Sequence, residues 1–352
     1  MKKMYLFVAI VAAAVMLLAA CGPAATPTAA PVAAATAAPA VPVLLPTTTL
    51  PPVPTATVNP LGTAADPIVL AFAPSTSSTQ LTTGGQAFAD ALGKATGLSF
   101  KVSVPTSYAA QIEAMGSGNA QVGFLAPAAF IVAHAKGYAD VAMVSLRNGA
   151  DHYAFQYIAN AAGGFKSYYD ATTGKDTADA ATALAQFAGK KPCWTDPISA
   201  SGYLVPAGFL AANNIKTLAG AWVQGHPTVV KSVYLSPKGE ICNFGATFVP
   251  MANISDPKSG AFMDYATKVQ TIWVSDPLIP NDTVAFGKSL PADMRQKISD
   301  AIVQLAGNPD GLKVLNGFGY SWSGVKVVDD TFFDPFRVYL QSINFDFNNF
   351  NG

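Results

Sequence analysis

Residues 192–204, PCWTDPISASGYL, contain the junction that decides the fold. An apolar run, Pro192 to Thr195, stops at Asp196-Pro197, and small hydroxyl residues lead into an apolar helical pattern that begins near Ser199. A short apolar run followed by a turn and a helix is typical of one unit of an α/β protein. In open α/β sheets, ligands bind beyond the carboxyl ends of the strands, where helix N-termini present unpaired amides. The same junction is therefore a candidate binding site.

Predicted strands and helices alternate on both sides of this junction. The predicted strands are 67–73, 100–104, 120–125, 141–146, 153–159, 192–195, 221–224, 241–244 and 271–274. The predicted helices are 86–95, 108–115, 128–136, 183–188, one that begins near Ser199, 228–235, 291–306, 309–316 and 335–343. This order predicts parallel sheets with helices on both faces. The α/β pattern begins again after residue 159, which predicts a second lobe.

The N-terminus has the features of an export signal. Lys2 and Lys3 precede an uncharged apolar run, Leu6 to Ala20, which is shorter than the roughly 20 residues of a membrane span. The run ends in LAACG, which looks like a bacterial lipobox. We expect residues 1–21 to be a lipoprotein signal peptide, with Cys21 lipidated as the first residue of the mature protein. An uncleaved anchor helix or an ordinary signal-peptidase site is the alternative.

The segment that follows, residues 22–65, is almost entirely Ala, Pro, Thr and Val and shows no periodicity. Such a composition cannot build a core, and its prolines favour extended conformations. We expect it to be a tether that holds an extracytoplasmic domain away from the bacterial cell membrane. The lipid anchor would then be the only contact with the membrane.

The composition excludes several classes of function. The chain has 21 basic and 21 acidic residues, and this zero net charge argues against nucleic acid as a partner. The three histidines are scattered, so no metal site or cofactor is expected. Ser199, His226 and Asp282 could be read as a hydrolytic triad, but no Gly-x-Ser-x-Gly surrounds the serines. We therefore predict that the protein is not an enzyme, and we expect a monomer.

Cys193 and Cys242 remain once Cys21 is assigned to the lipid anchor. An even pair in an oxidising compartment predicts a disulfide. Two buried free thiols in neighbouring strands are the alternative.

Ser199 and Ser201 are the first candidates for ligand contacts. Their hydroxyl groups can donate hydrogen bonds beside the amides of the helix N-terminus, an arrangement that suits an anion. Ordinary N-capping of the helix explains a serine at this place equally well.

Several segments resemble, in the same order, the substrate-binding proteins of phosphonate, phosphite and phosphate ABC transporters. DPISASGYL (196–204) is similar to the family signature DPxSTSGxL. The other matching segments are SYAAQIEAMGSGNAQVGFLAPAAFIVAH (107–134), GHPTVVKSVY (225–234), SDPLIPNDTVAF (275–286) and LPADMRQKISDAIVQLAGNPDG (290–311). The resemblance implies the type II periplasmic binding protein fold, with two Rossmann-like lobes joined by two crossover strands near 153–159 and 271–281. The expected lobes are 66–157 with 275–352, and 158–274.

The resemblance also implies a set of ligand-binding residues. Ser199, Ala200 through its amide, and Ser201 would hold the phosphoryl oxygens, with Tyr108 and Tyr153 reaching them from the first lobe and the crossover. His226 would donate to an anion oxygen, and Asp282 would accept from a P–OH group or a ligand amine. Taken singly, the two tyrosines could be core aromatics, His226 a solvated helix start and Asp282 a turn former.

Two departures from the family pattern narrow the expected ligand. Ala200 replaces the threonine between the two serines, which removes one hydroxyl donor. Gly245 to Phe248 are uncharged where aminoalkylphosphonate-selective members carry an acidic residue. The expected ligand is therefore phosphite, phosphate, hypophosphite or a short alkylphosphonate. Since Asp282 is an acceptor, we expect it to disfavour a fully deprotonated anion.

The resemblance implies a function in transport, in which the lipoprotein delivers its ligand to an ABC permease and its ATPase. A lipoprotein that senses another small organic ligand and signals to a membrane partner is the alternative.

Overall fold

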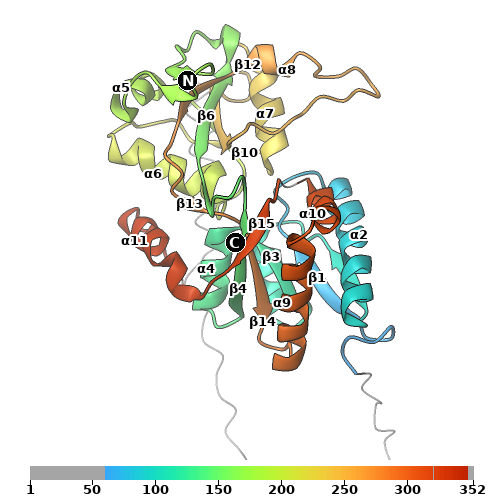
Figure 1. Ribbon diagram of the computed structural model, residues 1–352. Helices are drawn as coiled ribbons and strands as arrows, with labels where there is room; N and C mark the ends of the chain where they lie inside the picture. The colour runs from blue at the N-terminus through green and yellow to red at the C-terminus, as the bar shows by residue number, and fades with distance from the viewer. Residues whose placement is uncertain (1–59, 320, 348–352) are drawn as a thin grey trace, which may run out of the picture. The chain divides into compact units, whose positions relative to one another are not determined.

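The structure is a computed structural model that describes residues 60–319 and 321–347 (Figure 1). The chain divides into two units, Met1–Ala56 and Thr57–Gly352, and every described residue belongs to the second. The predicted signal peptide, Cys21 and most of the tether lie outside the described residues. Within the described part of the chain, no helix is long and apolar enough to cross a membrane.

The first lobe is built on a six-stranded sheet in the order β15-β4-β14-β3-β1-β2. Its strands are β1 (Ile68–Phe72), β2 (Phe100–Ser103), β3 (Val122–Leu125), β4 (Ala139–Leu146), β14 (Thr283–Gly287) and β15 (Gly324–Val327). β1 pairs in parallel with β2 and β3, whereas β14 is antiparallel to both β3 and β4. The sheet is thus mixed and not parallel as predicted, because β14 returns from the second lobe and enters in the opposite direction.

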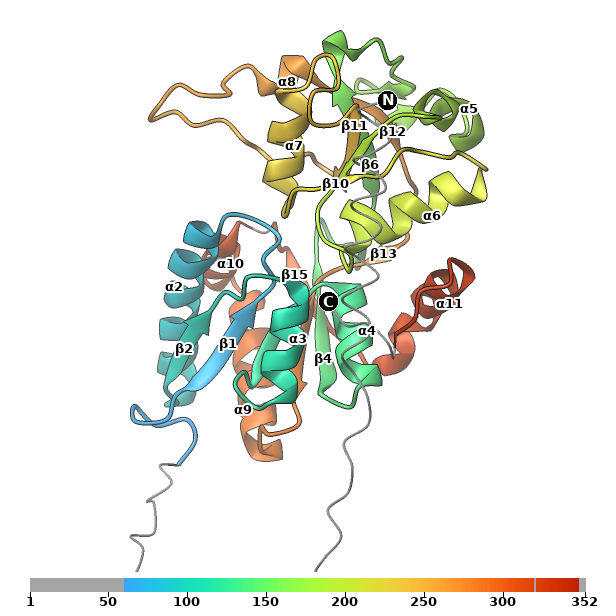
Figure 2. The ribbon, with the colours of Figure 1, turned by 180° about the vertical axis from the view of Figure 1, so that it is seen from behind.

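Helices cover both faces of this sheet, as predicted (Figures 1 and 2). One face carries α2 (Ser78–Thr96), α9 (Ala292–Ala306) and α10 (Pro309–Leu315), and the other carries α3 (Tyr108–Gly116) and α4 (Pro127–Ala135). On the α2 face, the rings of Phe72 and Phe124 stack with centroids 4.5 Å apart, and Phe88 and Phe318 pack against them. These buried aromatics fix how α2 and the C-terminal segment meet the sheet.

The second lobe has a five-stranded sheet in the order β10-β9-β11-β6-β12. Its strands are β6 (Phe155–Asn160), β9 (Pro192–Trp194), β10 (Ala221–Trp222), β11 (Phe244–Phe248) and β12 (Val269–Val274). Its main helices are α6 (Val205–Ala212) and α7 (His226–Tyr234). Two shorter helices, α5 (Ala180–Leu184) and α8 (Tyr265–Lys268), also belong to this lobe. β9 is parallel to β10 and β11, and β6 is antiparallel to its neighbours. The predicted strand 241–244 is displaced, because strand pairing with β6 begins only at Phe244.

Short elements complete the fold. They are β5 (His152–Tyr153), β7 (Tyr169–Asp170), β8 (Lys175–Asp176), β13 (Ile279–Pro280) and the helical turns η1 (Ala161–Gly163), η2 (Ala185–Phe187), η3 (Ala200–Leu204), η4 (Asn316–Phe318) and η5 (Asp330–Phe333). β5 and β13 pair with each other where the chain passes between the two large sheets. This small ribbon holds the two crossover segments together.

The structure contains the predicted disulfide. Cys193 lies in β9 and Cys242 lies two residues before β11, with the sulfur atoms 2.04 Å apart and the Cα atoms 5.5 Å apart. Both residues are fully buried beside Val229 and Val233 of α7. The bridge therefore ties β9, which leads to the serine-rich turn, to the strand beside it.

The C-terminal helices do not all pack where we expected. α9 and α10 return to the first lobe, but α11 (Asp334–Ser342) lies against α6, where the rings of Tyr339 and Phe209 meet. The Tyr339 hydroxyl donates to the carbonyl of Val205 over 3.0 Å, and a Cβ at Gly208 would lie 2.5 Å from that hydroxyl oxygen. The close approach of α11 thus requires a glycine in α6, a pairing that the periodicity of either helix alone does not reveal.

Candidate anion-binding site

A cavity of about 540 Å³ lies between residues that follow the carboxyl ends of strands from both sheets. Ser75 follows β1, Ala126 follows β3 and Arg147 follows β4, while Ser199 follows β9 and Val249 follows β11. All seven residues that the sequence assigned to ligand binding line this cavity: Tyr108, Tyr153, Ser199, Ala200, Ser201, His226 and Asp282. The carboxyl edges of the two sheets therefore meet at one site.

Several helices begin at the cavity. Tyr108 is the first residue of α3, Ala126 is the N-cap of α4, Ala200 opens η3, which runs into α6, and His226 opens α7. The cavity lining also includes Gln80, in the first turn of α2. Each helix start contributes amides that have no intrahelical partner and the positive end of a dipole. The sequence pointed to the serine-rich turn and, through the resemblance, to Tyr108 and His226, and the tertiary structure adds the starts of α2 and α4.

The two serines of the serine-rich turn accept hydrogen bonds within the protein and can still donate one to a ligand. Ser199 is the N-cap, and its Oγ accepts from the amide of Gly202 over 3.1 Å, so the N-capping alternative is correct for this oxygen. Ser201 Oγ accepts from the Tyr153 hydroxyl over 3.3 Å. Since each serine oxygen acts as an acceptor, its single O–H is left to donate. Capping and anion binding are therefore compatible at both residues.

Gly202 allows the turn to close tightly. A Cβ at this position would lie 2.0 Å from Thr195 Oγ1 and 2.8 Å from Ser199 Oγ. Residues 200–204 form a π-helical turn, a rare conformation that is found frequently at functional sites. Both serines are 2 % exposed, so water competes little for their hydroxyl groups.

His226 is buried, and its ring contacts Thr247 and Phe248 of the second lobe. Its Nδ1 lies 2.9 Å from Thr247 Oγ1, and its ring packs edge-on against Phe248 with centroids 4.5 Å apart. Burial, and to a smaller extent the charge of Arg147, lowers the pKa of His226 to about 3. The imidazole is thus neutral at physiological pH, and it can donate to an anion only from the nitrogen that carries its one proton.

The two tyrosines approach the turn from different elements. Tyr108 is 3 % exposed at the start of α3, and Tyr153 lies in β5. Burial, together with the charge of Asp282, raises the pKa of Tyr153 well above its usual value, so its hydroxyl stays protonated as a donor. Asp196 accepts from the amide of Ile198 over 2.9 Å, and its carboxylate also interacts with the backbone amide of Tyr108. This aspartate thus connects the serine-rich turn to α3.

Asp282 lines the cavity, but it already carries a partner that the sequence analysis did not identify. Arg147 Nη2 lies 2.5 Å from Asp282 Oδ2, with side chains that are 20 % and 15 % exposed. Burial raises the pKa of Asp282, and the neighbouring guanidinium opposes this shift. The guanidinium carbon also lies 5.4 Å from the centre of the Tyr153 ring. Asp282 is therefore one half of an ion pair and not an isolated acceptor.

Two further cavity residues were missed or misjudged. His152, which the sequence analysis did not assign to the site, lines the cavity, and its Nδ1 lies 2.7 Å from Asp151 Oδ1. Arg147 precedes Asn148-Gly149, and this dipeptide after a strand is the signal of a tight hairpin turn that could have been recognised. The pattern marks the turn, but it does not indicate where the arginine side chain lies.

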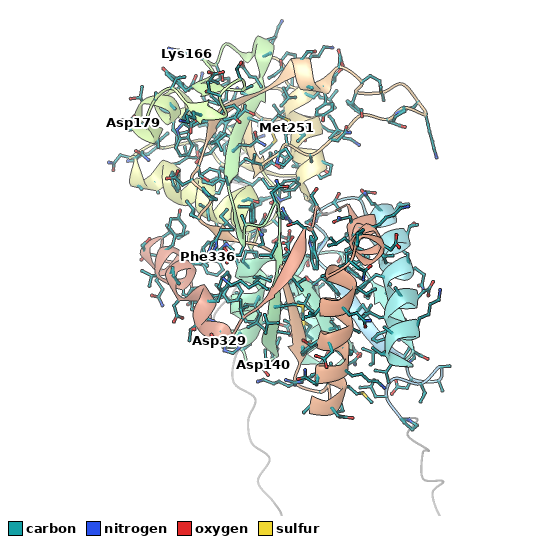
Figure 3. The ribbon with its side chains drawn as sticks, in the orientation of Figure 1. Asp140, Lys166, Asp179, Met251, Asp329 and Phe336 are labelled. Atoms are coloured by element: carbon teal, nitrogen blue, oxygen red, sulfur yellow. A yellow bond between two sulfur atoms is a disulfide. The ribbon has the colours of Figure 1, made fainter. Side chains whose placement is uncertain are left out.

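Part of the cavity lining is apolar. Phe248, Val249, Pro250, Met251 and Ala252 contribute to it. Met251 belongs to the segment that follows β11, and Figure 3 shows its place in the second lobe. Among the described residues, no cluster of three or more His, Cys, Asp or Glu side chains could hold a metal ion.

Two lobes with a cleft at the carboxyl ends of their strands define a periplasmic-type solute-binding protein of type II fold. Residues 70–332 match the family model described as ABC transporter, phosphonate, periplasmic substrate-binding protein, and the chain belongs to this family. The family serves solute binding for ABC import together with a permease and an ATPase, so the chain is an extracytoplasmic binding protein and not an enzyme.

Individual proteins are similar to this chain in sequence or in fold. The phosphate-import protein PhnD of Mycolicibacterium smegmatis is 26 % identical over 243 residues, which cover 67 % of this chain and 71 % of PhnD. A binding protein component of an ABC phosphonate transporter from Pseudomonas aeruginosa has 22 % identity and a TM-score of 0.63, covering 81 % of this chain and 90 % of its own. PhnD1 from Prochlorococcus marinus, in complex with methylphosphonate, has 11 % identity and a TM-score of 0.66, covering 79 % and 98 %.

Proposed function

We propose that this protein is a lipid-anchored receptor that captures a small phosphorus oxyanion in the cavity. The ligand is phosphite, phosphate, hypophosphite or a short alkylphosphonate. The observation that carries the proposal is the meeting of all seven expected ligand residues in one cavity at which several helices begin. The similarity to a phosphate-import protein and to a methylphosphonate complex supports the same ligand class.

The donor set suits such an anion. Ser199 and Ser201 each retain an O–H, Tyr108 and Tyr153 add phenol groups, and His226 is a neutral donor. Neutral donors bind an anion in a water-poor site without the desolvation cost of several buried cations. The apolar wall around Met251 fits a short alkyl substituent better than an ammonium group.

Ligand binding would close the two lobes. We propose the boundaries 66–154 with 275–352, and 155–274, moved from the expected 157/158 so that the whole of β6 belongs to the sheet of the second lobe. The motion would occur at the paired crossovers β5 and β13, since they connect the two large sheets.

The protein would work as a monomer, tethered through Cys21 and residues 22–65. Loss of membrane association and of lipid labelling in the Cys21→Ala variant would test the anchor.

Titration calorimetry with phosphite, phosphate, hypophosphite, methylphosphonate and 2-aminoethylphosphonate tests the ligand class. We expect phosphite or phosphate to bind at least as tightly as the aminated ligand. Tyr108→Ala or His226→Ala should weaken binding by about 1 to 3 kcal/mol. The matched control is His134→Ala, since this half-buried histidine lies outside the cavity lining.

Two results would contradict the proposal. One is a clear preference for 2-aminoethylphosphonate, which would mean that an ammonium site exists. The other is unchanged affinity in both the Tyr108 and the His226 variant, which would mean that the ligand binds elsewhere.

A further inference from the structure

Arg147 and Asp282 are held opposite each other by the backbone of the first lobe. Arg147 directly follows β4 and Asp282 directly precedes β14, and these strands are hydrogen-bonded neighbours. The amide of Ser145 donates to the carbonyl of Asp282 over 2.9 Å. The two side chains therefore emerge side by side at the rim of the cavity.

The turn after Arg147 is fixed as well. Arg147 and Ala150 exchange backbone hydrogen bonds of 2.8 and 2.9 Å around Asn148 and Gly149, whose φ angles are 50° and 78°. Positive φ at both central residues is the conformation of a type I′ turn, which Asn-Gly favours. Asn281 Nδ2 donates to the carbonyl of Ala150 over 2.9 Å and so joins this turn to the segment that carries Asp282. The ion pair is thus preorganised.

The charge of the cavity lining depends on this pair. Among the described residues that line the cavity, Arg147 and Asp282 are the only members of the Arg, Lys, Asp and Glu types. His226, which also lines it, is neutral. Asp282 alone would give the site one negative charge, which would repel a dianion more strongly than a monoanion. With Arg147 present the charges of this pair cancel, and the helices that begin at the cavity still contribute the positive ends of their dipoles.

We infer that Arg147 is the specificity-determining residue that lets this site accept a fully deprotonated, doubly charged oxyanion. This inference rests on the proposed function and replaces the expectation that Asp282 disfavours such a ligand. Arg147 cancels the repulsion from Asp282, whereas the serines, tyrosines and His226 supply donors for either charge state. Its guanidinium also packs on the ring of Tyr153, whose hydroxyl contacts the serine-rich turn, so its charge is held close to the anion site.

The effect of ligand charge can be measured apart from ligand protonation by comparing two anions at one neutral pH. Hypophosphite is a monoanion and sulfate is a dianion, and neither gains or loses a proton there. Calorimetry of both anions with the full-length protein gives the sulfate-to-hypophosphite affinity ratio. We expect measurable sulfate binding by the wild type. In Arg147→Gln the ratio should fall about 10- to 100-fold.

A second variant separates charge from structure. Arg147→Gln leaves Asp282 without its cation and therefore also lowers stability. The double variant Arg147→Gln/Asp282→Asn instead keeps a neutral, hydrogen-bonding pair of similar size. If Arg147 acts by cancelling charge, the double variant should recover most of the wild-type ratio. Arg337→Gln is the matched control, because Arg337 is 19 % exposed, pairs with aspartates and lies outside the cavity lining.

The possible results point in different directions. Wild-type protein that binds hypophosphite but no dianion overturns the inference and leaves the proposed function intact. A double variant whose ratio stays low also overturns it, because Arg147 would then contact the ligand instead of balancing Asp282. Wild-type protein that binds none of the phosphorus oxyanions contradicts the proposed function itself.

Discussion

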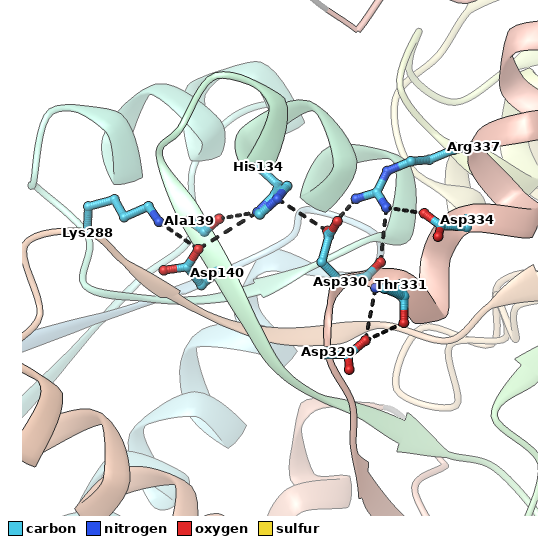
Figure 4. Close-up of polar contacts among 9 residues, drawn as sticks. All are labelled: His134, Ala139, Asp140, Lys288, Asp329, Asp330, Thr331, Asp334 and Arg337. Carbon is cyan, nitrogen blue, oxygen red and sulfur yellow. Dashed lines mark hydrogen bonds and ion pairs between the residues drawn. The ribbon is translucent and has the colours of Figure 1, made fainter.

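The first lobe contains two clusters of arginine and aspartate, and they differ in burial. In the cavity, Arg147 pairs with Asp282, which is 15 % exposed. In the second cluster, His134 lies between Asp140 and Asp330, which pair with Lys288 and Arg337 and are each 37 % exposed (Figure 4). Asp140 and Asp329, which neighbours Asp330, are labelled in Figure 3 at the far end of the first lobe from Met251.

The pKa values of the aspartates reflect this difference. Burial raises the pKa of Asp282 despite the adjacent guanidinium. At Asp140 burial acts in the same direction, but hydrogen bonds and charges from Lys288 and Arg295 outweigh it and lower the pKa. Similar residue types therefore make a buried ion pair at the cavity in one place and a solvated link between elements in the other. The comparison teaches that access to water, and not the identity of the pair, decides what the charges do.

The largest expected effect concerns stability. Arg147→Ala leaves the buried Asp282 without a partner and should lower the free energy of unfolding by about 3 kcal/mol. Arg337→Ala should cost less than about 1 kcal/mol, because Asp330 and Asp334 can be solvated instead. Urea unfolding of both variants measures the difference. Equal losses would show that burial does not separate the two clusters.

A smaller effect concerns affinity. Tyr153→Phe keeps the aromatic ring beside Arg147 but removes the hydroxyl that donates to Ser201. The variant should bind the ligand about 1 kcal/mol more weakly in calorimetry while its unfolding midpoint stays unchanged. Tyr138→Phe, outside the cavity lining, serves as the control. A loss of stability without a loss of affinity would assign Tyr153 to the core alone.

The two clusters should also respond to pH with opposite signs. The folded-state pKa of Asp140 is lowered, so its contribution to stability is present above the unfolded-state pKa of about 3.9 and is lost as the pH falls through the folded value. The folded-state pKa of Asp282 is raised, so its contribution is full below about pH 3.9 and is lost as the pH rises through the folded value. Unfolding curves of Asp140→Asn and Asp282→Asn against pH should therefore diverge from the wild type in opposite directions.

The smallest effect is a dependence on salt. Lys288 Nζ lies 2.6 Å from Asp140 Oδ1, and the lysine side chain is 53 % exposed. Raising the salt concentration should reduce the cost of Lys288→Ala from a few tenths of a kcal/mol toward zero. The cost of Arg147→Ala should change little over the same range, because the cavity pair is shielded from ions. A similar salt dependence of both variants would argue against this shielding.

The sequence predicted most of the elements because their signals are local. The apolar run before Asp196 marks β9, the Ser-rich turn marks the start of a helix, and Pro127 and Pro309 open helices as prolines do. The sequence analysis missed two strands of the first lobe. β14 lies largely in the segment 275–286, which was matched to the family as a whole and not divided into elements. β15 pairs only with β4, at the edge of the sheet. Their strand conformation depends on neighbours that are distant in sequence.

The sequence by itself determined the α/β class, the serine-rich turn, the cysteine pair and, through resemblance, the set of seven cavity residues. These features follow from periodicity, turn chemistry and ordered motifs, which are local properties of the chain. Only the tertiary structure decided that Arg147 meets Asp282, that several helices begin at one cavity and that α11 packs on α6. Those outcomes depend on which strands become neighbours and on which side chains are removed from water, and neither is encoded in the spacing of residues along the chain.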